Sequence, residues 1–358
     1  MALYAKLRTR PALFFATTGI ALDRFEALLP EFSRLYAEHE AMRKRRVLAT
    51  GHERQRAVGG GAQFATDLPE RLLMALVYYR VYATQEFLTL LFDVRHKSTI
   101  CRAIAQMRPL LEAVLPVPER ARETALHLAT KETERRRRRI GNVADFVREY
   151  PELTLLIDGT EQPKQRPTDT QKRKDDYSGR KKRHTLKQIL TTTPGGLILD
   201  QSPSVGGRTH DMRAFREHVA TSTATATGTA TGTATGTGGG ASLWSSLAHL
   251  RVTCYADSGF SGMDTMSLPV TTRLVAQARR GRPLTPEQKV LNHVRSRVRI
   301  RVEHAIGQRK RYRVASSVYR GADETYDGVM EVVAGLVNLR QYDRIKAQTG
   351  LDLMDVRP

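Results

Sequence analysis

LTLLID, residues 153–158, marks the point where the chain changes from helical to strand-like patterning. It is a short apolar run, with Pro151 two residues before it and Asp158 at its end. Runs of this length with turn-forming residues at their borders are typical of strands. The same character is repeated downstream in HTLKQIL (184–190), GLILDQS (196–202), HLRVTCYAD (249–257) and VTTRLVA (270–276).

Two helical stretches separate or follow these strands. THDMRAFREHVA (209–220) lies after the third strand, and PEQKVLNHVRSRVRIRVEHAIGQRKRYR (286–313) lies after the fifth. The predicted order from residue 151 is therefore three strands, a helix, two strands and a helix. This order is typical of a mixed α/β domain.

Upstream of residue 150, helical spacing dominates. From Ile20 to about Arg45, and again from residue 68 to residue 111, apolar residues recur at intervals of three and four. Thr84 is placed to cap the middle helix of the second stretch, and Asp93-Val94 makes a short break before RHKSTICRAIAQM. We therefore predict a helix-turn-helix arrangement here.

These changes divide the chain into four parts. We expect a helical domain over residues 1–115, a basic linker over 116–150, an α/β domain over 151–345 and a tail over 346–358. Residues 221–240 contain only Ser, Thr, Ala and Gly. Such a tract lacks the apolar area that offsets the entropy of ordering, so we expect a flexible surface insertion.

The charge of the chain indicates its partner. Lys and Arg number 58 against 37 Asp and Glu, which gives a formal net charge of +21. A balance this basic favours a polyanion, with nucleic acid as the leading candidate. We expect no membrane partner, since no segment has the ~18 uninterrupted apolar residues of a spanning helix. Two cysteines, Cys101 and Cys254, predict neither a disulfide framework nor a metal cluster, and fit a reducing cytoplasm.

Three acids form a candidate catalytic set. Asp158 and Asp257 each end a predicted strand, and Glu303 lies among seven bases in residues 297–313. Taken singly, the aspartates are common turn formers, and Glu303 is an i, i+4 partner of Arg299. Together, three carboxylates in a basic chain suit Mg²⁺ or Mn²⁺. Two such ions ~3.5 to 4 Å apart support in-line displacement at a phosphodiester, so we expect these acids to be both metal ligands and catalytic.

Basic residues beside these acids are candidates for DNA contacts. At ~3.6 residues per turn, Arg299 and Lys310 project from nearly the same helical face as Glu303 and are placed to bracket a phosphate. The alternative is a solvated basic face with an incidental ion pair.

Two further basic clusters are expected to contact DNA. One lies at the start of the second helix of the helix-turn-helix, where it is placed to enter a major groove. The other precedes a predicted strand, where it would track phosphates, although a basic hairpin loop without a fixed role remains possible. The first cluster is Arg95, His96, Lys97, Ser98, Thr99 and Arg102; the second is Arg180, Lys181, Lys182, Arg183, His184 and Lys187.

Several motifs carry a resemblance to a known family. In chain order they are LLIDGTE (155–161), YSGRKKRHTLKQ (177–188), YADSGFSG (255–262), RVRIRVEHAIGQRKRYRV (297–314) and GLVNLR (335–340). Across about residues 68–340 the sequence resembles the DDE transposases of bacterial insertion sequences, in particular insertion-sequence family five and the DDE superfamily endonuclease group.

The resemblance implies an RNase H-like catalytic domain with Asp158, Asp257 and Glu303 as its metal-binding triad, and an amino-terminal helix-turn-helix module. Related families carry a Tyr, Arg, Glu, Lys signature on the last helix. Arg299, Glu303 and Lys310 match its spacing, whereas Ser296 takes the tyrosine position. GRTHDMRAF (207–215) also resembles a family motif, although Asp211 in it is equally well explained as a helix cap.

The resemblance further implies a transposase that binds terminal inverted repeats, hydrolyses a phosphodiester at the element end and uses the freed 3′-OH to attack target DNA. Two alternatives stay open: an RNase H-like nuclease that cuts without joining, and a non-catalytic DNA-binding descendant. The implied partners are the double-stranded DNA of element ends and target, and further copies of the chain in a homodimer or larger assembly. The expected location is the bacterial cytoplasm, at the nucleoid.

Overall fold

The structure is a computed structural model that describes residues 2–49, 66–137, 153–226, 243–247, 252–278 and 283–356. The chain forms two compact units. The first comprises Met1–Leu115 together with Arg311–Ala315, and the second comprises Pro116–Lys310 together with Ser316–Pro358. Among the described residues, none of the helices combines the length and the apolar character needed to span a membrane.

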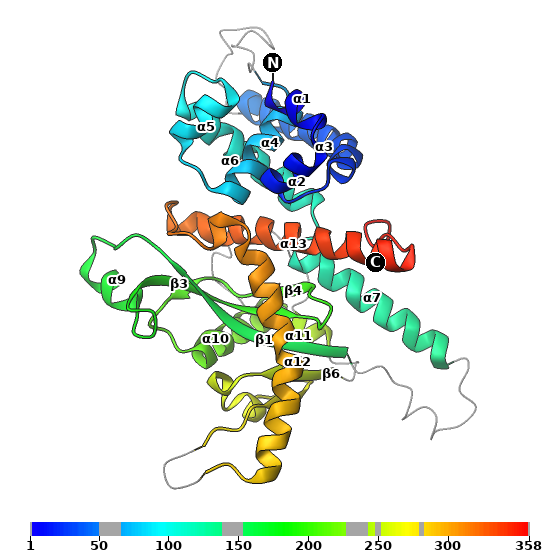
Figure 1. Cartoon of the computed structure of the whole chain (residues 1–358), viewed down its shortest axis with the longest axis vertical. Coiled ribbons are helices and arrows are strands. Elements are labelled where there is room, and N and C mark those ends of the chain that lie inside the picture. The colour runs from blue at the N-terminus through cyan, green and yellow to red at the C-terminus, as the bar shows by residue number, and fades with distance from the viewer. Residues whose placement is uncertain are drawn as a thin grey trace. The chain divides into compact units, whose positions relative to one another are not determined.

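In its described residues, the first unit forms helices and the turns that join them (Figure 1). Helix α4 is its most buried element, since every side chain from Leu72 to Val77 is at most 2% exposed. Phe14 and Phe25 pack ring to ring at 5.2 Å beside it. The helices are α1 Leu3–Arg8, α2 Pro11–Thr18, α3 Leu22–Ala49, α4 Leu68–Val81, α5 Gln85–Phe92 and α6 Lys97–Val114.

The helix boundaries near residue 90 follow from local chemistry. The Thr84 hydroxyl accepts a hydrogen bond from the Phe87 amide at 3.2 Å, so Thr84 caps α5 as predicted. Asp93 has a φ of 52°, in the left-handed region, and ends the same helix. The predicted helix, turn, helix pattern is confirmed as α5 and α6.

The second unit is built on a seven-stranded mixed sheet. The main path runs β2-β3-β1-β6-β7, and β4 and β5 also pair with β3. Pairing of β1 with β3 is antiparallel, whereas β6 runs parallel to both β1 and β7. The strands are β1 Leu153–Pro163, β2 Tyr177–Ser178, β3 Arg183–Thr192, β4 Ile198–Gln201, β5 Val205–Gly206, β6 Val252–Ala256 and β7 Thr271–Leu274.

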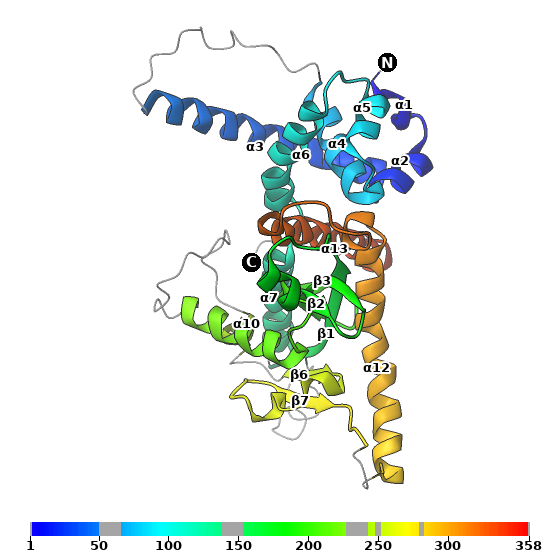
Figure 2. The same ribbon diagram turned by 90° about the vertical axis from the view of Figure 1, so that its left-hand side faces the viewer.

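Helices cover both faces of this sheet. In Figure 2 the strands lie between α10 on one side and α12 on the other. On the α10 side the core is aromatic, with Phe215 in edge contact with Trp244 at 5.1 Å and with Phe260 at 5.9 Å. The helices of this unit are α7 Pro118–Arg137, α9 Thr170–Asp175, α10 Asp211–Ala226, α11 Leu243–Ser246, α12 Pro286–Lys310 and α13 Tyr326–Thr349.

The predicted fold class, a mixed-sheet α/β domain preceded by an all-α domain, is confirmed. Three segments differ from expectation. Part of the expected linker forms α7, because Ala121 and the partly buried Ala125 and Leu128 make an apolar face that packs in the core. Residues 138–150 of that linker lie outside the described part.

The Ser/Thr/Ala/Gly tract begins as helix. Residues 221–226 continue α10, and the hydroxyls of Thr221 and Ser222 bond the carbonyls one turn earlier. The remainder, 227–240, lies outside the described residues. The expected tail likewise begins inside α13, which runs to Thr349 before Gly350 ends it with a φ of 74°.

Candidate active site at the carboxyl ends of strands β1 and β6

The parallel pairing of β1 with β6 positions the two aspartates. Leu156 lies opposite Tyr255, so the same register continued by two residues brings Asp158 level with Asp257. Helix α12 contacts both strands and carries Glu303. A cavity of about 170 Å³ lies here, and the charged residues that line it are Asp158, Glu161, Arg180, Lys181, Lys187, Asp211, Glu303 and Lys310.

Asp158 is a partly buried carboxyl group whose Oδ1 accepts a hydrogen bond from the Gly159 amide at 2.9 Å. Burial raises its pKa from 3.8 to about 6. The Arg299 guanidinium opposes that shift, whereas the charges of Asp257 and Glu303 add to it. The Asp257 and Glu303 carboxylates therefore both act electrostatically on Asp158.

Asp257 is held by the turn that follows β6. Its Oδ1 accepts a hydrogen bond from the Gly259 amide at 2.7 Å and caps the 3₁₀ turn Ser258–Phe260. The turn-forming role considered from the sequence is thus real. It also fixes the carboxylate at the carboxyl end of the strand, beside the site.

Glu303 and Arg299 lie one helical turn apart on α12, with Arg299 Nη2 at 4.0 Å from Glu303 Oε1. The Arg299 side chain is 14% exposed and that of Glu303 is 57% exposed. The buried Arg299 Nε has no hydrogen-bond partner among the described residues. Arg299 is thus a positive group inside the site, and only part of its hydrogen-bonding capacity is used.

Lys310 extends the basic side of the cleft. The pKa of Lys310 is below its ordinary value, because burial and the neighbouring charges of Lys181 and Arg309 lower it. The negative charges of Asp158 and Glu161 oppose part of this shift. Lys310 and Lys181 both line the cavity with Asp158. The structure therefore brings together Arg299, Glu303 and Lys310 of the predicted α12 signature with the first aspartate.

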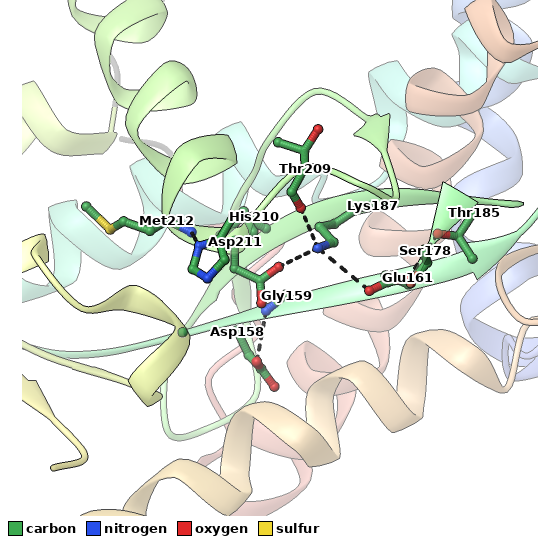
Figure 3. A network of polar contacts seen from close by, with 12 residues as sticks. Asp158, Gly159, Glu161, Ser178, Thr185, Lys187, Thr209, His210, Asp211 and Met212 are labelled. Atoms are coloured by element: carbon green, nitrogen blue, oxygen red, sulfur yellow. Dashed lines mark hydrogen bonds and ion pairs between the residues drawn. The ribbon is translucent and has the colours of Figure 1, made fainter. Parts of the chain in front are cut away.

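A polar network beside Asp158 was not predicted (Figure 3). Its hub is Lys187, whose Nζ donates to the Thr209 carbonyl at 2.6 Å and lies 2.8 Å from Asp211 Oδ1 and 3.7 Å from Glu161 Oε1. Thr185 donates its hydroxyl to Glu161 Oε2 at 2.9 Å. Neither side of this network follows from sequence spacing, because it depends on the β1–β3 register that sets Glu161 opposite Lys187.

Asp211 lies against both strand ends. A Cβ added at Gly159 would approach its carboxyl carbon to 3.2 Å, and one added at Gly259 would approach its Oδ2 to 3.4 Å. The capping role considered for Asp211 is not what the structure shows. Helix α10 begins at Asp211 itself, the His210 Nδ1 accepts from the Met212 amide, and the Asp211 carboxylate pairs with Lys187.

The acids suit a divalent cation by their chemistry. They offer only carboxylate oxygen, the donor that Mg²⁺ and Mn²⁺ prefer, and the charges of Asp257 and Glu303 contribute to the raised pKa of Asp158. In the described parts of the chain, however, no group of three or more His, Cys, Asp or Glu is arranged to hold a metal ion. The donor set fits, while a closed coordination shell is not formed.

Apart from Arg299 and Lys310 on α12, the predicted DNA-contacting residues form two clusters, and nearly all of them are accessible to solvent. At the start of α6, Thr99 is partly exposed and Arg95, His96, Lys97, Ser98 and Arg102 are exposed. On the β2–β3 hairpin, His184 is partly exposed and Arg180, Lys181, Lys182 and Arg183 are exposed. Lys187 differs from expectation because its side chain is only 8% exposed and its ammonium bonds the internal network.

Two family models match the chain. The model described as "DDE superfamily endonuclease" matches residues 157–338, and the model "Helix-turn-helix of DDE superfamily endonuclease" matches residues 67–116, which hold α4, α5 and α6. A curated relative, the "Probable transposase for insertion sequence element IS702" of Microchaete diplosiphon, is 24% identical over 271 residues. That alignment covers 76% of this chain and 80% of the relative. No solved structure matches the chain.

The first model covers the two strand-end aspartates, the Lys187 network and α12, and the second covers the predicted helix-turn-helix. The family named from the sequence motifs is thereby confirmed. This chain belongs to the DDE superfamily endonucleases and carries the helix-turn-helix of that family.

Proposed function

We propose that this chain is an insertion-sequence transposase that binds the terminal inverted repeats of its element and cuts phosphodiester bonds there. The single observation that carries the proposal is that the β1–β6 register brings Asp257 level with Asp158, which lines a basic cleft together with Glu303. The name of the curated relative supports the same conclusion.

Asp158, Asp257 and Glu303 are the residues that would hold Mg²⁺ or Mn²⁺, as one ion or two. A bound divalent cation supplies Lewis acidity that activates the attacking hydroxyl group and stabilises the leaving oxygen. We assign the α/β unit to the RNase H-like class, supported by a mixed sheet whose adjacent parallel strands present the two aspartates.

The basic residues of the cleft hold the DNA that the acids alone would repel. Arg299 and Lys310 flank Glu303 along α12, and Lys181 faces the same cavity from the hairpin. Their positive charge favours a phosphate at the cavity mouth. The Lys187 network orients Glu161 and Asp211 beneath this position and completes the wall of the site.

Helices α5 and α6 are the proposed reader of the element ends. The residues around the start of α6, Arg95 to Thr99, would enter the major groove, and Arg102 would contact phosphate from one turn later. Joining of two ends requires two sites, so we propose that two or more copies assemble on DNA.

A strand-transfer assay separates this proposal from the nuclease alternative. A duplex of the element end with a free 3′-OH is incubated with a supercoiled target plasmid and Mg²⁺ or Mn²⁺. A transposase covalently joins the labelled end to the plasmid, and Asp257→Asn abolishes the joined product. Cutting of an intact end without any joined product would assign the chain to nucleases that do not join.

A further inference from the structure

A second basic pocket lies on the β2–β3 hairpin, apart from the cleft. Its volume is about 840 Å³. Side chains of successive strand residues point to opposite faces, and the hairpin follows that rule. Arg183 and Thr185 of β3 line a cavity that adjoins the cleft and shares Lys310 with it. His184, which lies between them in sequence, lines the second pocket instead. The two sites therefore lie on opposite faces of the hairpin and share none of their lining residues.

The charge of the pocket is one-sided. Arg166, Arg173, Lys174 and Arg208 line it, and none of the described residues in its lining is acidic. Arg208 lies 4.0 Å from the exposed Asp175, a distance at which the pair is weak. The Arg173 Nη2 donates to Thr170 Oγ1 at 2.8 Å, but its buried Nε has no hydrogen-bond partner among the described residues. The pocket thus offers several positive donors to an anion.

An aromatic platform stands among these cations. Tyr177 is 42% exposed, and its ring meets that of His184 edge-on, with centroids 5.6 Å apart at 71°. The two residues are register partners on β2 and β3, so the backbone fixes both rings. An exposed aromatic ring held among arginines is the arrangement that stacks an unpaired base while the cations bind its phosphates.

The surrounding backbone is rigid. Asp169 caps α9 by accepting from the Lys172 amide at 2.7 Å, and Lys164 pairs with Asp176 at 2.8 Å. Gly206 of β5 packs so closely on the end of α9 that a Cβ there would lie 2.5 Å from the Asp175 carbonyl oxygen. The basic side chains of α9 and the Tyr177 ring are therefore presented by an ordered scaffold.

We infer that this pocket binds an unpaired DNA strand, with a base stacked on Tyr177 and its phosphates on Arg166, Arg173 and Arg208. A volume of 840 Å³ has the size of small-ligand sites and has room for a few nucleotides. A duplex also hides the base faces that Tyr177 is placed to contact. For the source of the strand the inference rests on the proposed function, because a staggered cut of the two strands at an element end leaves an unpaired overhang.

Equilibrium binding tests this site without any cutting. Fluorescence anisotropy of a labelled oligo-dT 12-mer and of a labelled duplex is measured in EDTA with the full chain. Tyr177→Ala weakens oligo-dT binding by roughly five- to a hundredfold, the range of one base–aromatic stack, and leaves duplex binding within about twofold. Tyr177→Phe keeps the ring and retains the affinity.

Arg208→Gln and Arg213→Gln form a matched pair for charge. Both arginines are exposed, 68% and 75% by side chain, and each faces one carboxylate, but Arg213 lies on α10 outside the pocket. Arg208→Gln weakens oligo-dT binding and lowers its salt dependence, whereas Arg213→Gln changes neither. Because both sites are on the surface, neither substitution disturbs the fold.

Three results would overturn the inference: wild-type oligo-dT affinity in Tyr177→Ala, equal losses for oligo-dT and duplex, or displacement of oligo-dT by polyglutamate as readily as by unlabelled oligo-dT. The last result would assign the pocket to acidic peptides. Failure of the proposed function is separable, since a chain that never cuts DNA can still show Tyr177-dependent oligo-dT binding, and a chain that cuts can lack it.

Discussion

The ammonium of Lys187 holds two carboxylates from different elements beside the candidate active site. Asp211 begins α10 and Glu161 lies on β1, and Lys187 on β3 reaches both while donating to the Thr209 carbonyl. A buried carboxylate carries a desolvation penalty, and a paired ammonium group offsets it. At the scale of single residues, the site thus depends on an ion pair that bears no direct relation to the three predicted acids.

Replacing Lys187 by methionine tests this dependence. The substitution leaves Asp211 and Glu161 uncompensated, and we expect the free energy of unfolding to fall by about 3 to 5 kcal/mol. Urea unfolding measures the loss. Lys346→Gln is the matched control, because its ammonium pairs with Asp352 at 2.9 Å but is 52% exposed, and it should cost under about 1 kcal/mol. Equal losses in the two variants would contradict the structural role of Lys187.

His218 provides a pH-dependent contribution to stability. Burial alone would lower the pKa of His218. The adjacent Asp200 carboxylate, whose Oδ2 lies 2.8 Å away, raises it by more, so the net pKa is above 6.5. A histidine whose pKa is higher in the folded than in the unfolded state stabilises the protein fully at pH below the unfolded-state pKa. This contribution is lost as the pH rises through the folded-state pKa. The wild type should therefore lose stability as pH rises above about 6.5, and His218→Gln should lose less over the same range. Urea midpoints measured from pH 6 to pH 9 check this, and parallel curves for the two proteins would refute it.

The boundaries of the two helices of the helix-turn-helix, α5 and α6, follow from local sequence signals. Thr84 caps α5, Asp93 ends it in the left-handed region, and α6 then begins at Lys97 with its first turn exposed. These features were predictable because caps and turn residues act over three or four positions. Strand pairing acts over longer distances. Accordingly, the five strand runs were predicted, while the short strands β2 and β5 and the Glu161–Lys187 pairing were not.

Basic residues near the start of α6 are expected to contact DNA phosphates. Lys97→Gln and Arg102→Gln together should weaken binding to a duplex of the element end and lower the slope of log affinity against log salt by about 0.9 for each lost phosphate contact. Arg108→Gln on the same helix is the matched control, since its side chain is 35% exposed and lies 3.6 Å from Glu112. Anisotropy titrations over a salt series measure both slopes. An unchanged slope in the double variant would place the DNA contact elsewhere.

At the scale of the whole molecule, the helical unit is discontinuous in sequence. It includes Arg311–Ala315, the segment that follows α12, and Tyr312 there is fully buried. The Arg80 guanidinium lies 5.1 Å from the centre of the Tyr312 ring and its Nη1 donates to the Arg311 carbonyl. The sequence predicted a boundary near residue 115, but no local pattern indicates that a segment two hundred residues later completes the unit. Only long-range packing determines that assignment.

Tyr312→Ala should therefore destabilise the helical unit by about 3 to 5 kcal/mol, the usual cost of removing a large buried ring. Hydrogen exchange of the α4 amides reports on this unit, and their protection should fall by the corresponding factor. Tyr255→Ala, at the partly exposed position of the otherwise buried strand β6, serves as the comparison and should leave α4 protection unchanged. Unaltered α4 exchange in Tyr312→Ala would show that the segment contributes nothing to the unit.

The central claim is that Asp158, Asp257 and Glu303 form one metal-dependent catalytic site. The most direct test is cutting of a labelled duplex of the element end with Mg²⁺ or Mn²⁺ and with EDTA. Glu303→Gln is compared with Glu287→Gln, the same change on the same helix at an exposed position. We expect metal-dependent nicking at the element boundary by the wild type and by Glu287→Gln, and DNA binding without nicking by Glu303→Gln. Binding without nicking by the wild type, or wild-type nicking by Glu303→Gln, would contradict the central claim.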